Sequence, residues 1–105
     1  MTKLSVDDFR RIALSFPGVE EGTSYGTLAF RFRKKFLARL REDGETIALR
    51  IGFDERDILM QMDPATFFIT DHYRGYPAVL VRLGSVGEER LRDVLTQAVK
   101  FRGKK

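Results

Sequence analysis

The segment "DHYRGYP" (71–77) gathers the side chains most able to do chemistry, immediately before an apolar run at 78–83. It contains the only histidine of the chain, two of its three tyrosines and one arginine. In one interpretation the segment is a rigid corner, in which the polar tips of the rings bond the loop's own backbone and Gly75 takes a turn conformation awkward for other residues. In the other it belongs to a recognition surface, because tyrosine rings stack on planar ligands and arginine contacts phosphate.

The recognition interpretation implies a particular set of residues and a particular shape. It takes side chains from two segments of the chain, which together would line a groove beside a cationic face of the sheet: Tyr25, His72, Tyr73, Arg74 and Tyr76. Such a module would bind a small ligand or a protein partner. We then expect a deep pocket between the 71–77 segment and the loop at 22–27.

Catalysis and metal binding are poorly supported by the same residues. Asp71 and His72 are adjacent, and neighbours in an extended segment point to opposite sides, so this carboxylate does not orient the imidazole. Neither Ser24 nor Thr70 has a nucleophile motif around it. One histidine and no cysteine leave only scattered carboxylates as metal ligands. We therefore assign no catalytic residue, no metal site and no cofactor, and we expect a protein that is not an enzyme.

Residues 28–33, 36–41 and 46–51 alternate apolar and polar side chains with a period of two. The loop "EDGE" has hairpin length, and two lysines mark the turn between the first two segments. This pattern predicts a meander of three antiparallel strands, with Phe36 on the apolar face and Leu37 on the opposite one. The opposite face, which we call the arginine face, collects five arginines: Arg31, Arg33, Arg39, Arg41 and Arg50.

The arginine face has two interpretations. A sheet with one wet face needs charged side chains, and Lys or Arg on strands also prevents edge-to-edge pairing. Alternatively, the guanidinium groups offer bidentate donors to phosphate and planar groups that stack on bases. Acidic residues are scarce on this face and collect in the hairpin loop and at helix starts, whereas a solvated face usually mixes its signs. This distribution favours an anion-binding role.

Helical signals precede the strands. Residues 5–16 predict a helix, because Val6 and Phe9 begin an apolar stripe at helical spacing. Ser5 is its expected N-cap, with Asp8 in the capping-box position. A Pro-Gly pair stops this helix, and we expect a Gly-bearing loop over 17–27.

The second half of the chain carries further helical signals. Residues 54–62 predict a short helix capped by Asp54, and residues 67–69 predict a short strand. Residues 85–103 predict one continuous capped helix with Ser85 as its N-cap. With helices at both ends of the meander, the expected fold is α+β: an antiparallel sheet with the N- and C-terminal helices packed on one face.

The composition is that of one globular domain over residues 1–105. There are 19 Lys and Arg against 15 Asp and Glu, and this net charge of +4 favours a polyanionic partner such as DNA. No apolar stretch reaches the roughly 20 residues of a membrane span, and nothing near Met1 looks like a signal peptide. We therefore expect a cytoplasmic protein, a monomer, with no membrane partner.

Three runs of residues resemble the MmcQ/YjbR family. They are "RRIALSFPGVEE" (10–21), "GTSYGTLAFRFRKKFLARL" (22–40) and "FFITDHYRGYPAVLVRL" (67–83). The resemblance implies a compact domain similar to the CyaY (frataxin-like) fold, with a double-wing arrangement that binds DNA. Iron binding of the frataxin type is not expected, since it needs clustered carboxylates and those of this chain are dispersed.

If the resemblance holds, the wings are the β-hairpins and their cations contact phosphates. The expected contacts are Arg31, Arg33, Lys34, Lys35, Arg39, Arg41 and Arg50, to which Arg74, Lys104 and Lys105 add. The predicted strands contain no Asn or Gln to recognise adenine, so the expected affinity is weak and largely independent of sequence.

Overall fold

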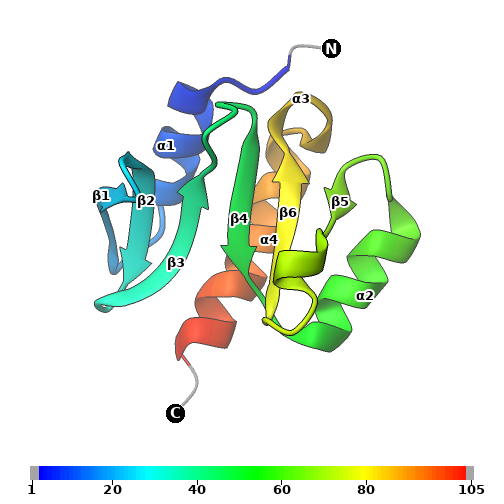
Figure 1. Cartoon of the computed structure of the whole chain (residues 1–105). Coiled ribbons are helices and arrows are strands. Elements are labelled where there is room, and N and C mark those ends of the chain that lie inside the picture. The colour runs from blue at the N-terminus through cyan, green and yellow to red at the C-terminus, as the bar shows by residue number, and fades with distance from the viewer. Residues whose placement is uncertain (1–2, 104–105) are drawn as a thin grey trace.

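The computed structural model of the chain describes residues 3–103. At its centre is a six-stranded antiparallel sheet with the order β1-β2-β3-β4-β6-β5 (Figure 1). The strands are β1 (Val19–Ser24), β2 (Thr27–Phe32), β3 (Lys35–Leu40), β4 (Thr46–Arg50), β5 (Phe67–Phe68) and β6 (Ala78–Arg82). The helices are α1 (Val6–Leu14), α2 (Phe53–Met62), α3 (Leu83–Val86) and α4 (Glu88–Gly103), and η1 (Asp71–Tyr73) is a single 3-10 turn. The predicted α+β class is confirmed.

The two faces of the sheet have different surroundings. Helices α1 and α4 cover one face, as predicted, while α2 flanks the β5–β6 edge. The other face is open apart from η1 and the segment that follows it, which lie in front of β6 in Figure 1. This open face is therefore where side chains of several strands can meet a ligand.

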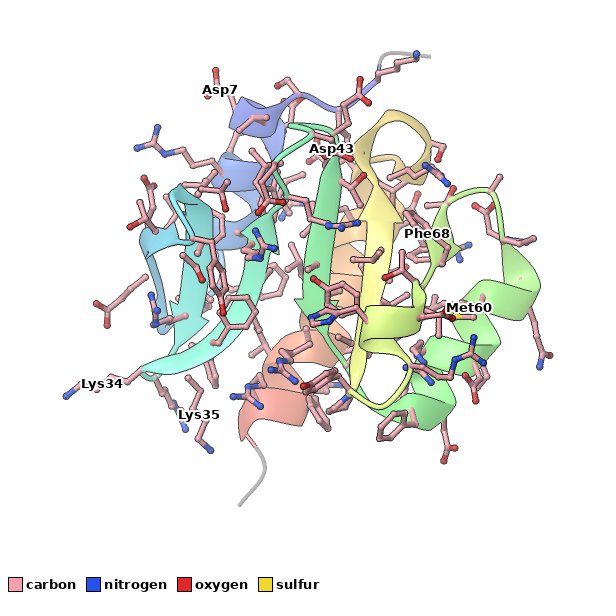
Figure 2. The ribbon with its side chains drawn as sticks, in the orientation of Figure 1. Asp7, Lys34, Lys35, Asp43, Met60 and Phe68 are labelled. Atoms are coloured by element: carbon pink, nitrogen blue, oxygen red, sulfur yellow. The ribbon has the colours of Figure 1, made fainter. Side chains whose placement is uncertain are left out.

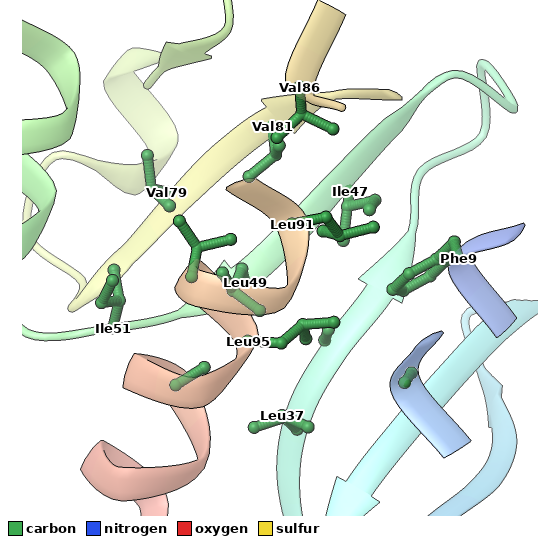
Figure 3. Close-up of a cluster of buried hydrophobic side chains, with 14 of the residues drawn as sticks. Phe9, Leu37, Ile47, Leu49, Ile51, Val79, Val81, Val86, Leu91 and Leu95 are labelled. Atoms are coloured by element: carbon green, nitrogen blue, oxygen red, sulfur yellow. The ribbon is translucent and has the colours of Figure 1, made fainter. Parts of the chain in front are cut away.

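The core fills the space between the sheet and the two helices (Figure 3). Leu91 and Leu95 of α4 are 1% and 0% exposed, and they pack with Leu49 of β4. The Phe9 ring of α1 stands edge-on to Phe30 of β2, with ring centroids 5.0 Å apart. Each such side chain contributes roughly 1.5–3 kcal/mol by leaving water, so the helices are held firmly on this face.

Helix α1 forms where the sequence predicts it. The Asp8 N–H donates to Ser5 Oγ at 3.1 Å, and the Ser5 N–H donates to Asp8 Oδ2 at 2.8 Å. This reciprocal pair is the predicted capping box, and it satisfies two backbone donors that an uncapped helix leaves open. Phe9, Ile12 and Ala13 are fully buried on one face of the helix.

The segment predicted as a loop over 17–27 contains the edge strand β1, so that prediction is wrong. Val19 pairs with Phe32 and Ser24 with Thr27, in unbroken antiparallel register. The strand lacks a clear apolar alternation because it lies at the edge of the sheet, where most of its side chains remain exposed or half-buried. Backbone pairing with β2, and not side-chain pattern, defines it.

A β-bulge in the β2–β3 pair reverses two predicted side-chain directions. Phe30 pairs with Ala38, but the next pair is Arg31 with Phe36, so Leu37 is the extra residue on β3. Leu37 is consequently fully buried in the core (Figure 3), and Phe36 shares the open face with Arg31. Strict alternation had placed both side chains on the wrong faces.

The two hairpins on this side of the sheet have two-residue turns with positive φ. Tyr25 (φ 55°) and Gly26 (φ 78°) join β1 to β2, while Arg33 (φ 51°) and Lys34 (φ 71°) join β2 to β3. Left-handed conformations at both central residues match the twist of the flanking strands. Arg33 therefore lies in a turn and not on the strand face where alternation had placed it.

The later helices begin differently from prediction. Helix α2 has Gly52 as its N-cap, not Asp54, and the Arg56 N–H donates to the Gly52 carbonyl at 2.9 Å. The C-terminal helix is interrupted at Gly87 (φ 75°), which separates α3 from α4. The Ser85 hydroxyl accepts a bond from the Thr66 hydroxyl at 2.8 Å and does not cap α4. None of the helices described is both long and apolar enough to cross a membrane.

Candidate functional site

The open face collects most of the predicted arginines. Residues paired across antiparallel strands project to the same side. Arg39 pairs with Ala29 and Ala48, and Arg50 with Ala78, so these arginines rise from a floor of small side chains. Arg31 also lies on this face, over β1: a β-carbon added at Gly22 would lie 3.4 Å from its Nη1.

A groove of about 730 Å³ lies on this face, between the segments expected to enclose a pocket. Tyr25 lines one side, and Thr70, His72, Tyr73 and Tyr76 line the other. The floor and ends come from β3, from β4 and from the two residues that follow β3, through Phe36, Arg39, Arg41, Glu42, Ala48 and Arg50. The structure thus brings four of the predicted recognition residues together with three of the predicted phosphate-binding arginines. The prediction places the recognition residues in a groove beside the arginine face, whereas the arginines lie in the groove itself.

Each arginine of the groove lies against an aromatic ring. The Arg39 guanidinium carbon is 5.2 Å from the centre of the Tyr25 ring, and that of Arg41 is 5.8 Å from Tyr73. Arg50 lies 5.9 Å from both Phe36 and Tyr76. These distances are within the ~6 Å over which a cation is attracted to a ring face. Cations and rings therefore alternate around the groove.

The groove carries an excess of positive charge. Arg39 donates to Glu42 Oε1 at 3.1 Å. No carboxylate of residues 3–103 lies within 4.0 Å of Arg41 or Arg50. Arg41 Nε is buried without a hydrogen-bond partner in the described chain. Two of the three arginines of the groove therefore carry a charge that no carboxylate within 4.0 Å balances.

A fourth cation, which the sequence analysis did not include, lies near Arg50. Arg102 of α4 has a lowered pKa, first because burial penalises its charge and then because the Arg50 guanidinium repels it. Its Nε also has no hydrogen-bond partner in the described chain. No local sequence signal places Arg102 here, since its position depends on how α4 packs beneath the sheet.

Backbone hydrogen bonds hold the 71–77 segment in place. Successive bonds run from Tyr73 N–H to the Thr70 carbonyl at 2.9 Å and from Tyr76 N–H to the Tyr73 carbonyl at 3.1 Å. The Ile51 N–H donates to the Pro77 carbonyl at 3.0 Å and ties the segment to the end of β4. The segment is the predicted corner, but Gly75 is not among the residues with positive φ, so that part of the prediction is wrong.

Arg56 of α2 supports the same segment from beneath. Its side chain is 8% exposed, and its Nη1 donates to the carbonyls of Tyr76 at 3.0 Å and Tyr73 at 3.3 Å. No local sequence pattern around Arg56 indicates this role, because the carbonyls that it binds lie 17 to 20 residues further along the chain. It fixes the wall of the groove that carries both tyrosines.

The polar atoms of the aromatic side chains in the 71–77 segment make no hydrogen bonds within the described chain. Among the described residues, no side-chain hydrogen bond is made by His72, Tyr73 or Tyr76, contrary to the expectation that their tips would bond the loop backbone. The His72 ring instead stands edge-on to Tyr73, with centroids 5.1 Å apart. Asp71 accepts a bond from Arg74 at 2.7 Å. The hydroxyls of Tyr73 and Tyr76 and the ring nitrogens of His72 are therefore free to bond a ligand, while the rings themselves also contact Arg41, Arg50 and each other.

The remaining predicted cations lie outside the groove. Lys34 and Lys35 project from the β2–β3 hairpin end in Figure 2, and the Arg33 guanidinium lies 5.0 Å from the centre of the Phe32 ring. Arg74 forms an exposed ion pair with Asp71 and does not line the groove. Lys104 and Lys105, which were also predicted to contact phosphate, lie outside the described residues.

A smaller hollow of about 490 Å³ lies at the β3–β4 hairpin end of the sheet. It is lined by charges of both signs, Lys3 and Arg82 with Asp43 and Glu45, and by no aromatic ring. Asp43 (Figure 2) uses its carboxylate to accept bonds from the N–H groups of Glu45 and Thr46, both at 2.9 Å. This hollow therefore lacks the excess charge and the rings that distinguish the groove.

Comparison with known proteins identifies the fold and the family of this chain. A crystal structure of the Deinococcus radiodurans protein DR2400, which has a DUF419 domain, matches with a TM-score of 0.77 at 24% identity, over 96% of this chain and 80% of that one. Uncharacterised proteins of Mycobacterium tuberculosis and Mycobacterium bovis are 37% identical over 57 residues, which are 52% of this chain and 43% of theirs. This chain thus spans less than half the length of these relatives. The YjbR family model matches residues 14–99, and the chain belongs to the YjbR family.

Proposed function

We propose that the arginine face binds nucleic acid through contacts to phosphate that are weak and largely independent of sequence. The observation that carries this proposal is the cluster of Arg39, Arg41 and Arg50 in one groove. Arg41 and Arg50 have no carboxylate within 4.0 Å in the described chain, although the Arg41 charge still helps to lower the pKa of Glu42 and Asp43. An unpaired cation in a concave surface favours an anion that supplies the missing partner, and phosphate accepts bidentate bonds from arginine.

The electrostatics of the groove support an anionic ligand. Arg50 and Arg102 lie close enough for the Arg50 charge to lower the pKa of Arg102, in addition to the larger effect of burial. Two like charges that disfavour each other are both stabilised when an anion binds between or beside them. Arg102 does not itself line the groove, so an anion bound beside Arg50 would relieve only the smaller of the two effects on the pKa of Arg102.

The β2–β3 hairpin end supplies further cations at the margin of the face. Lys34 and Lys35 extend from it into solvent (Figure 2), where they can follow a phosphate backbone beyond the groove. In this proposal the hairpin acts as a wing. The six strands contain no Asn or Gln, so the contacts available are to phosphate and to the faces of bases, and not to their edges.

The dependence of affinity on salt tests the proposal. A fluorescently labelled oligonucleotide titrated at several salt concentrations should give log K a slope of about −2 to −3 against log [salt], because each of three contacts contributes about −0.7 to −0.9. Arg41→Gln and Arg50→Gln should each weaken binding and make the slope less steep by about one contact. Lys100→Gln on α4, which loses the same charge at an exposed residue that does not line the groove, is the matched control. Absence of binding at low salt would refute the proposal.

A second candidate function is supported by the shape of the groove. Its volume of about 730 Å³ lies within the ~300–1,000 Å³ of sites for small ligands, and it is lined by Tyr25, Tyr73 and Tyr76. The corresponding ligand is a small anion with a planar ring. Calorimetric titration with free nucleotides distinguishes the two functions, since a free nucleotide that binds more tightly than an oligonucleotide favours the small-ligand site.

A further inference from the structure

We propose that the groove takes a single-stranded segment of nucleic acid, whose bases stack on the tyrosine rings while its phosphates lie on the arginines. This inference rests on the proposed function and specifies its substrate class. A duplex would contact only the cations at the margin of the face. Single strands should therefore bind more tightly than duplexes of equal phosphate number.

The first argument is the depth at which the arginines lie. The side chain of Arg39 is only 12% exposed, and Arg41 and Arg50 are half-buried. Tyr25 is 85% exposed and Tyr76 50% exposed, so the rings stand out above the guanidinium groups. A duplex is stiff and presents its phosphates on a convex surface, which suits cations that project. A flexible single strand can enter the groove and reach the recessed cations.

The second argument is the availability of the rings. The bases of a duplex are already stacked on their neighbours and paired, so they have no free face for a tyrosine. The bases of a single strand do have free faces, and aromatic platforms beside a cationic groove are how sequence-tolerant single-strand binding is usually achieved. All three tyrosines of the chain line this groove, and each lies within 6 Å of an arginine that can hold the adjacent phosphate.

The third argument is the size and rigidity of the site. Three strand spacings of about 4.8 Å separate β2 from β6, which gives about 14 Å, or about four nucleotides at a stacking distance of ~3.4 Å. Arg56 holds Tyr73 and Tyr76 through their carbonyls, so this wall is formed before binding. A preformed wall loses little conformational freedom when a base stacks on it.

Intrinsic fluorescence gives a direct test, because the chain has three tyrosines and no tryptophan. Every emitting ring is in the groove, so quenching reports stacking at this site and nowhere else. We expect an eight-nucleotide oligothymidylate to quench the emission with saturation. A blunt duplex of equal phosphate number and long-chain inorganic polyphosphate should bind without comparable quenching.

Ring variants connect the quenching to affinity. Tyr73→Leu should weaken binding of the octamer by about five- to a hundredfold, which is the range for loss of one base stack. Tyr73→Phe should leave affinity unchanged, since the hydroxyl has no hydrogen bond in the described structure and the ring remains. Phe68→Leu is the matched control, because its ring contacts Arg82 at 4.2 Å on the same face but outside the groove. Melting temperatures identify any variant that has lost its fold. Quenching of the wild-type protein tests whether bases stack on the tyrosines without the need for any variant.

The possible outcomes separate this inference from the proposed function. Equal affinity for duplex and octamer without quenching would overturn the inference and leave phosphate binding intact. A mononucleotide that quenches at the same concentration as the octamer would overturn it in favour of a site for free nucleotides. Absence of binding by any nucleic acid at low salt would overturn both proposals.

Discussion

Replacing Arg56 with methionine tests whether a buried arginine holds the tyrosine wall of the groove. Arg56 is 7% exposed overall, and its Nη1 donates to three carbonyls of the 73–76 segment at 3.0, 3.3 and 3.5 Å. Methionine retains the apolar stem of the side chain but lacks the guanidinium group, so it cannot donate a hydrogen bond. The substitution therefore removes the side-chain donor from these carbonyls, although those of Tyr73 and Tyr76 still accept backbone bonds from Tyr76 and Ala78.

The expected cost follows from the geometry of these bonds. A hydrogen bond to a charged group contributes about 1.5–3 kcal/mol, and only the bond at 3.0 Å has good length, so we expect a loss of about 2–3 kcal/mol. For a domain of this size, 1 kcal/mol corresponds to roughly 4–8 °C in melting temperature. Arg56→Met should then lower the Tm by about 10 °C or more.

Thermal unfolding monitored by circular dichroism is the assay, and Arg74→Met is the control. Arg74 belongs to the same segment and makes a shorter contact, 2.7 Å to Asp71, but both side chains are largely exposed, so its removal should not change the Tm measurably. A Tm within about 2 °C of wild type for Arg56→Met would refute the role we assign to Arg56. An equal fall in Tm for Arg56→Met and Arg74→Met would show that burial of the arginine does not determine how much it stabilises the protein.

Two further predictions concern the frame of the sheet. Leu37→Ala should lower the free energy of unfolding, measured with denaturant, by about 2–5 kcal/mol, because the bulge buries Leu37 in the core. Phe36→Ala should lower it much less, because Phe36 lies on the open face. A larger loss for Phe36→Ala than for Leu37→Ala would contradict the bulge. Asp43→Ala should destabilise the β3–β4 turn by about 1 kcal/mol at neutral pH. Burial alone would raise the pKa of Asp43, but bonds donated by Glu45 and Thr46 outweigh it and hold the pKa below its ordinary value of 3.8. This stabilisation is therefore fully present above pH 3.8 and is lost as the pH falls through the lowered pKa. The difference in unfolding free energy between wild type and Asp43→Ala should narrow over that pH range. A difference that does not change with pH would contradict the role assigned to Asp43.

Local patterns predicted much of the fold. The capping box at Ser5 and Asp8 formed as expected because all its atoms lie within one turn of helix. Strands β2, β3 and β4 were predicted because their apolar side chains alternate with polar ones, and those apolar side chains pack into a single core. The edge strand β1 was missed, since half-exposed residues such as Glu20 and Glu21 need no alternation. The bulge at Leu37 was missed because pairing with β2, and not the sequence of β3 alone, decides it.

The site was predicted in parts but not as a unit. The sequence indicates Arg39, Arg41 and Arg50 as one cationic face, and the rings at 25, 72, 73 and 76 as a groove beside it. Their union in one groove depends on the long-range order of strands, which places the segment after β5 across from the β1–β2 turn. Arg56 and Arg102 carry no local signal at all. Each acquires its role from burial against a distant segment.

Mapping a bound single strand by NMR tests the central claim most directly. The ¹⁵N-labelled protein is titrated with the thymidylate octamer, and backbone amides and arginine Nε–Hε signals are followed. We predict that the largest shifts occur at Arg41, Arg50, Tyr73 and Tyr76, with Arg41 prominent because its buried Nε has no partner in the described chain. Shifts confined to the helical face of α1 and α4, or no shifts at saturating octamer, would contradict the account.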